Sequence, residues 1–151
     1  MEVDVVTEVE IGRPRADVAA YAMDPDNATI WYRNITGVEW KSPPPLRVGS
    51  QIAFVAKFMG RTIAYTYEVE ELVPNELLVM ATAEGPFPMA TTYSWSDIGN
   101  GGTRMMLRNR GRPSGFSKVA APMMAKAIRR ANTKDLARLR DILVEDGDQP
   151  G

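Results

Sequence analysis

The chain has 151 residues, of which 44% are hydrophobic and 25% charged, a balance typical of one globular domain. Its formal net charge of −1 provides no overall field that attracts nucleic acid, so we expect no nucleic-acid partner. The chain contains no cysteine and no histidine, which excludes disulfides, thiol nucleophiles, zinc–thiolate sites and histidine bases, and we expect neither a metal nor a cofactor.

The N-terminal segment predicts one strand followed by two short helices. Apolar and acidic residues alternate over residues 2–11, the period of a half-buried strand with an acidic outer face. The Gly12-Arg13-Pro14 turn leads into a short helix over residues 16–23, which Asp24-Pro25 ends. A second short helical segment is expected after Asn27, and it carries Trp31 and Tyr32.

The middle of the chain predicts six consecutive strands with short connections. Turn signals such as Pro43-Pro44-Pro45, Met59-Gly60, Pro74-Asn75 and Gly85-Pro86 separate them, and short connections predict an antiparallel meander. The predicted strands cover residues 36–42, 50–58, 61–72, 76–83, 87–97 and 103–112.

The last third changes to a helical period. Over residues 119–145 apolar side chains share one face and basic side chains the other, as in a long amphipathic helix. This helix is the only predicted element large enough to cover the apolar face of a seven-stranded sheet. At about 1.5 Å per residue it spans roughly 40 Å, too little to fill the whole concave face. The remainder is packed core or a cavity. We expect one domain over residues 1–145 and a disordered tail over residues 146–151.

This order of elements resembles the helix-grip fold of the START and polyketide-cyclase-like superfamily, often called SRPBCC. Three segments carry the resemblance: YEVEELVPNELLV at residues 67–79, GTRMML at 102–107 and NTKDLARLR at 132–140. The resemblance implies an α+β fold in which a curved, seven-stranded antiparallel sheet wraps around the long C-terminal helix. It also implies a pocket for a hydrophobic lipid-, polyketide-, sterol- or quinone-like molecule. It does not imply one chemistry, because the fold hosts carriers, receptors, cyclases and chaperone activators.

Candidate cavity residues come from the inward faces of the strands and of the helix. Alternation places Tyr65 and Tyr67 on one inward face, and Tyr93 and Trp95 on another. A buried tyrosine needs a hydroxyl partner, which a wet cavity supplies, although ordinary core packing is the alternative. The loop around Phe87 is a candidate lid with an exposed aromatic tip, or a simple turn. The candidate ligand-binding residues are Trp31, Phe54, Tyr65, Tyr67, Phe87, Tyr93, Trp95, Met105, Met124, Ile128 and Asn132, with Trp31 and Phe87 at the mouth.

Two sets of polar residues have structural and functional interpretations. Asn132 and Asp135 lie on the apolar face of the helix, where they either tie helix to sheet or offer a ligand a polar contact. Asp135 is expected to pair with Arg138 or with a residue of the sheet. An arginine row on the last strand could bind phosphate or RNA. We favour cross-strand ion pairs with the acidic face of the first strand: the arginines are Arg104, Arg108, Arg110 and Arg112, and the acids Glu2, Asp4, Glu8 and Glu10.

Three functions remain open at this point. The first is binding or transport of a hydrophobic small molecule. The second is a polyketide cyclase or dehydratase, in which Tyr65, Tyr93, Asp135 or Glu84 would move protons; no spacing identifies a catalytic residue. The third is a protein-interaction module with a vestigial cavity. The acidic start at Glu2 and the lack of a long apolar run predict a cytoplasmic protein without stable membrane insertion, as a monomer or homodimer.

Overall fold

The computed structural model describes residues 2–116 and 119–148. Its strands form one antiparallel sheet in the order β1-β7-β6-β5-β4-β3-β2. Two α-helices and the 3₁₀ turn η1 connect β1 to β2, and the long helix follows β7. The elements are β1 (Val3–Ile11), α1 (Arg15–Ala22), η1 (Pro25–Asn27), α2 (Ala28–Trp31), β2 (Ile35–Trp40), β3 (Gln51–Phe58), β4 (Arg61–Val73), β5 (Leu77–Glu84), β6 (Met89–Ile98), η2 (Gly99–Gly101), β7 (Gly102–Gly111) and α3 (Ala121–Asp148).

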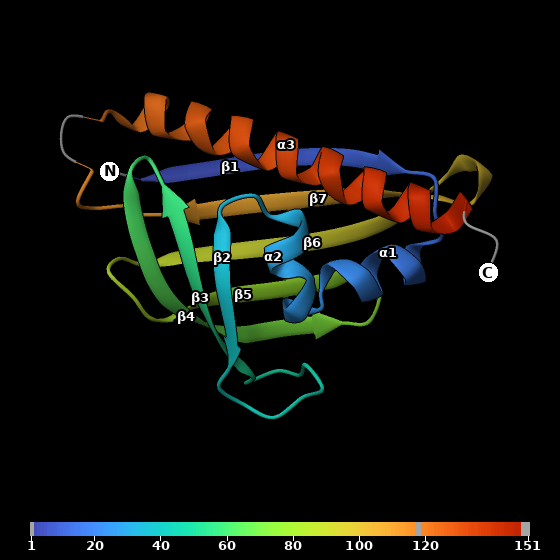
Figure 1. Ribbon diagram of the computed structural model, residues 1–151, viewed down its shortest axis with the longest axis horizontal. Coiled ribbons are helices and arrows are strands. Elements are labelled where there is room, and N and C mark those ends of the chain that lie inside the picture. The colour runs from blue at the N-terminus through green and yellow to red at the C-terminus, as the bar shows by residue number, and fades with distance from the viewer. Residues whose placement is uncertain (1, 117–118, 149–151) are drawn as a thin grey trace.

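The sheet curves around α3 and carries the short helices on the same side (Figure 1). α3 runs along β1 and β7, whereas α1 and α2 lie over the middle strands. At the other end β2, β3 and β4 curl up beside the helices. This is the predicted helix-grip fold, and every strand lies within two residues of its predicted bounds.

The long helix differs from the prediction at its C-terminal end. Residues 146–148, predicted as part of a disordered tail, form the last residues of α3. The rest of that predicted tail, residues 149–151, lies outside the described residues. Upstream, Leu136, Leu139 and Leu143 of α3 are buried against the sheet, so the apolar stripe extends almost to the end of the helix.

Local backbone features produce the curvature of the sheet. β4 shifts register against β5 between Thr66 and Tyr67 and again between Val69 and Glu71, and such bulges bend a strand and increase its twist. The hairpin from β3 to β4 turns through Met59 and Gly60, both at positive φ (50° and 78°), the conformation of a two-residue type I′ turn. At Gly60 the positive φ carries no strain, because glycine has no Cβ. The two-residue turn fixes the register of β3 and β4, which form one wall of the curved sheet.

The convex face of the β1–β7 pair carries the predicted ion pairs. Arg108 donates to Asp4 through Nε (2.8 Å) and Nη2 (2.6 Å), and Arg104 contacts Glu10 at 2.9 Å. Both pairs follow from the antiparallel register, which puts Glu10 directly opposite Arg104 and places Arg108 diagonally from Asp4, two residues along the strand on the same face. The prediction of cross-strand pairing is therefore confirmed for these two arginines.

Candidate functional site: an aromatic cavity under the long helix

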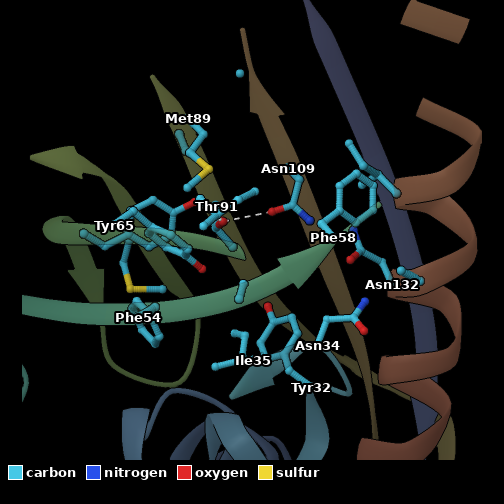
Figure 2. Close-up of a pocket in the computed structure, with 18 of the residues that line it drawn as sticks. Tyr32, Asn34, Ile35, Phe54, Phe58, Tyr65, Met89, Thr91, Asn109 and Asn132 are labelled. Carbon is cyan, nitrogen blue, oxygen red and sulfur yellow. Dashed lines mark hydrogen bonds between the residues drawn. The ribbon is translucent and has the colours of Figure 1, made fainter. Parts of the chain in front are cut away.

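A cavity of about 200 Å³ lies between the concave face of the sheet and the helices α2 and α3. Its wall is mostly apolar and comes from segments far apart in the sequence, including β3, β4, β6, β7 and the first half of α3. Figure 2 shows side chains from these segments pointing into one space. Of the eleven candidate residues, the structure places eight in this lining: Phe54, Tyr65, Tyr67, Phe87, Tyr93, Met124, Ile128 and Asn132.

The other three candidates lie in the packed core instead. Trp31 and Met105 are completely buried, and Trp95 is 3% exposed. Trp31, predicted at the mouth, stacks on Tyr32 with ring centroids 3.9 Å apart. The alternation in β6 is as predicted, but the strand crosses from the cavity into the tightly packed end of the sheet. Strand alternation identifies the inward face and not the point along it at which the cavity ends.

The loop before β6 also differs from the expectation of an exposed tip. Phe87 is only 7% exposed, and its ring meets that of Phe116 edge-on at 6.1 Å. The guanidinium of Arg61 lies 5.2 Å from the Phe116 ring centroid and 5.9 Å from that of Phe87, and Arg61 donates a hydrogen bond to the Ser114 carbonyl. This cluster fastens the segment before α3 across one end of the cavity.

Aromatic rings form the wall farthest from α3. Phe54 stacks against Tyr65 at 5.5 Å, and Tyr65 meets Tyr67 edge-on at 5.0 Å. Offset and edge-on arrangements of this kind stabilise aromatic clusters beyond simple burial. The result is a rigid apolar surface onto which a flat ring can pack.

A hydrogen-bonded relay crosses the floor of the cavity. The Tyr67 hydroxyl lies 2.8 Å from Thr91 Oγ1. Thr91 in turn donates to Asn109 Oδ1 at 2.9 Å, the bond drawn as a dashed line in Figure 2. Because the amide oxygen can only accept, the Thr91 proton is committed to it, and Tyr67 must then donate to Thr91. The relay therefore has one direction, from β4 through β6 to β7.

A second hydroxyl pair joins α2 to the sheet. The hydroxyls of Tyr32 and Tyr93 lie 2.5 Å apart, so the residue that caps α2 is tied directly to β6. Burial raises the pKa of Tyr67 to about 12 and holds the pKa values of Tyr32, Tyr65 and Tyr93 above the usual value near 10. At neutral pH all four are uncharged, so they act as hydrogen-bonding groups and not as bases.

The two polar residues on the apolar face of α3 behave differently from each other. Asp135 accepts a hydrogen bond from the backbone N–H of Arg33 at 3.1 Å and so ties α3 to the end of α2. The expected pairing with Arg138 or with the sheet is not found, because Arg138 donates to the Ile30 carbonyl at 2.6 Å. Burial raises the pKa of Asp135, an effect that the hydrogen bond from Arg33 opposes. Asn132 is 6% exposed and lines the cavity.

Sequence reasoning missed several residues of the lining. Asn34, Phe58 and Phe116 come from loops or strand ends, where no periodic pattern assigns a direction to the side chain, whereas Tyr32, expected beside Trp31 at the mouth, does line the cavity. Asn109 shares an inward strand face with Met105, and this parity was the signal that could have identified it.

Neither a metal site nor a membrane span is found in the described part of the chain. Over residues 2–116 and 119–148 there is no group of three or more carboxylates that could hold a metal ion. Within the same residues no helix is long and apolar enough to cross a membrane.

Comparison with known proteins identifies the family. A family model described as polyketide cyclase / dehydrase and lipid transport matches residues 2–144, nearly the whole chain. The chain belongs to this family. None of the curated proteins matches it.

Solved structures of other proteins show the same fold. A START superfamily protein from Mycobacterium smegmatis is 15% identical, with a TM-score of 0.81 over 94% of this chain and 97% of that one. The Zhui aromatase/cyclase from a Streptomyces species is 14% identical, with a TM-score of 0.80 over 100% and 99%. A protein from Thermus thermophilus is 18% identical, with a TM-score of 0.80 over 96% and 99%. At these identities the likeness establishes the helix-grip fold alone.

Proposed function

We propose that this family member binds a compact hydrophobic molecule in the cavity under α3. The observation that carries the proposal is the cavity itself, a space of about 200 Å³ with an aromatic wall inside an otherwise close-packed domain. An unfilled apolar cavity forfeits packing contacts and lowers stability. A ligand that fills the space restores those contacts, which gives the retained cavity a function.

The size of the cavity narrows the ligand class. An engineered apolar cavity of about 150 Å³ holds benzene, whereas drug-sized ligands occupy roughly 300–1,000 Å³. A cavity of about 200 Å³ lies between the two and favours a molecule of one or two rings over a sterol. Among the polyketide- and lipid-like molecules that the family description suggests, compact ring compounds fit best.

A cyclase or dehydratase acting in the same cavity is the second candidate, and Asp135 is the observation that favours it. Its carboxyl borders the cavity, and its pKa is raised towards the range in which a carboxyl exchanges protons near neutral pH. Against this role, the group already serves as acceptor for the Arg33 N–H. A protein-interaction module with a vestigial cavity fits the open space less well than either.

The test is a binding screen with a matched pair of variants. Wild type and variants are screened by thermal shift and intrinsic fluorescence against fatty acids, bicyclic ketones, quinones and sterols. Ala131→Leu projects a larger side chain into the cavity, whereas Ala137→Leu makes the same change on α3 outside the lining. Leucine is nearly as good a helix former as alanine, so both variants should fold.

We expect compact ring compounds to raise the melting temperature of wild type and of Ala137→Leu but not of Ala131→Leu. If no compound stabilises any of the three, the binding proposal is wrong. If a polyketide-like ketone is converted to product and Asp135→Asn stops the conversion without loss of binding, the cyclase alternative replaces it.

A further inference from the structure

The amide of Asn132 presents an unsatisfied donor to the cavity. In the described part of the chain, three buried side-chain nitrogens lack a hydrogen-bond partner: Nε1 of Trp31, Nε1 of Trp95 and Nδ2 of Asn132. The two indoles lie in the packed core, so of these three only the Asn132 amide faces the ligand space. An unpartnered buried donor lowers stability, and an acceptor on a bound molecule would recover that cost.

The orientation of a second amide, that of Asn109, also indicates a polar subsite at this end of the cavity. The Thr91 hydrogen bond fixes the Asn109 oxygen on the floor and thereby turns its Nδ2 group the other way. Figure 2 shows Asn34, Asn109 and Asn132 on the α3 side of the pocket, with Tyr65 and Phe54 on the opposite side. The three amides thus gather on the α3 side of the cavity, where Phe58 and Tyr32 also lie, whereas the wall formed by Phe54 and Tyr65 is aromatic.

We propose that this amide end, built around Asn132 Nδ2, binds a carbonyl or quinone oxygen of the ligand while its ring packs on the aromatic wall. This inference rests on the proposed function and names the ligand class: compact ring ketones or quinones, in preference to hydrocarbons of the same shape. An amide N–H donates and does not accept, so the complementary ligand atom must be an acceptor. The amides are uncharged, so an acceptor that carries no charge, such as a carbonyl oxygen, suits them better than an anion that would have to be buried unpaired.

The test compares two probes that differ by one carbonyl, 1-tetralone and tetralin, on two variants. Asn132→Leu keeps the approximate size of the side chain and removes its donor. Ile128→Ala, on the same face of α3 and also in the lining, removes apolar surface only. Affinities come from isothermal titration calorimetry or fluorescence quenching. For each protein the affinity for 1-tetralone is divided by the affinity for tetralin, and this ratio is compared between variant and wild type. The different solubilities of the two probes then cancel.

We expect Asn132→Leu to weaken 1-tetralone about tenfold relative to tetralin, the size of one hydrogen bond to a buried donor. Ile128→Ala should weaken both probes by a similar factor. Because the substitution removes an unsatisfied group, Asn132→Leu should melt no lower than wild type, whereas loss of a structural hydrogen bond would lower its melting temperature.

Other outcomes separate the two proposals. If Asn132→Leu affects both probes equally or neither, or if it melts several degrees lower, the carbonyl subsite is wrong while ligand binding stands. The subsite is also wrong if wild type binds tetralin but neither 1-tetralone nor any other ketone or quinone of the panel. If wild type binds no compound of the panel, the proposed function fails and the subsite fails with it.

Discussion

The relay from Tyr67 through Thr91 to Asn109 predicts that Tyr67→Phe lowers the stability of wild type but raises the stability of a Thr91→Val variant. Thr91→Val deletes the middle hydroxyl of the relay. Both groups that bonded to it, the Tyr67 hydroxyl and the Asn109 amide oxygen, then lose their hydrogen-bond partner. Tyr67→Phe deletes only the first donor and leaves the Thr91–Asn109 bond intact. Thr91 and Tyr67 are each 5% exposed, so solvent compensates little.

The magnitudes follow from the number of groups that lose their partners. Tyr67→Phe in wild type removes one net hydrogen bond, about 1 kcal/mol of stability. Thr91→Val strands two polar groups at about 1–3 kcal/mol each, and because both border the cavity we expect a total of about 2–4 kcal/mol. The double variant strands only the Asn109 oxygen and should cost about 1–3 kcal/mol. Adding Tyr67→Phe to Thr91→Val should therefore restore about 1 kcal/mol.

Urea denaturation of the four proteins measures this directly, provided that the denaturant dependence of the free energy of unfolding stays constant across the set. In a domain of this length about 1 kcal/mol corresponds to a shift of roughly 2–4 °C in melting temperature, so thermal scans provide an independent reading. If Tyr67→Phe costs the same amount in both backgrounds, the two hydroxyls are not coupled and the direction assigned to the relay is wrong.

Three further predictions concern charge, closure and pH. Burial raises the folded-state pKa of Asp135 above its unfolded value of 3.8, so the contribution of this residue to stability falls as pH rises from about 4 through the folded pKa. Asp135→Asn should therefore be more stable than wild type at pH 7 and lose that advantage near pH 3. An equal advantage at both pH values, measured by urea denaturation, would contradict this prediction. Arg61→Met keeps the apolar stem but loses the contacts with Phe116 and Phe87, so stopped-flow measurements should show faster ligand association and dissociation with little change in affinity; unchanged rates would mean that this cluster does not close the cavity. Affinity for 1-tetralone should stay constant from about pH 6 to pH 10, because the pKa of Tyr67 is about 12; a decline centred near pH 10 would reveal an unshifted tyrosine in the site.

The fold could be predicted from the sequence because each element has its own local signal. Alternation over residues 2–11, turn dipeptides such as Met59-Gly60 and the helical period after residue 119 each follow from backbone geometry. The ion pair between Arg104 and Glu10 was also predictable, since antiparallel pairing of the first and last strands brings these opposite charges face to face. These features depend on short-range spacing and on one pairing of strands.

The cavity was less predictable, because its extent depends on which inward positions the helices leave uncovered. Tyr93 and Trp95 follow the same alternation, yet the first lines the cavity and the second lies in the core. Asn132 could be picked out as a polar residue on an apolar face, but its lack of a partner is visible only in three dimensions. Asn34 and Phe116, outside regular strands, gave no directional signal at all.

The protonation states of the cavity determine how far it can go beyond binding. A general acid or base works best when its pKa lies near the working pH, and burial has moved the tyrosines away from that range. The Tyr67 proton is already donated to Thr91, but the amide of Asn132 can orient a carbonyl and polarise it without taking up a proton. Burial raises the pKa of Asp135, the direction that proton transfer near neutral pH needs, but the hydrogen bond that its carboxylate accepts from the Arg33 N–H gives it a structural role as well. A substrate would have to approach the oxygen that Arg33 leaves free before catalysis could begin. The cavity as built therefore favours holding and polarising a ligand carbonyl over transforming it.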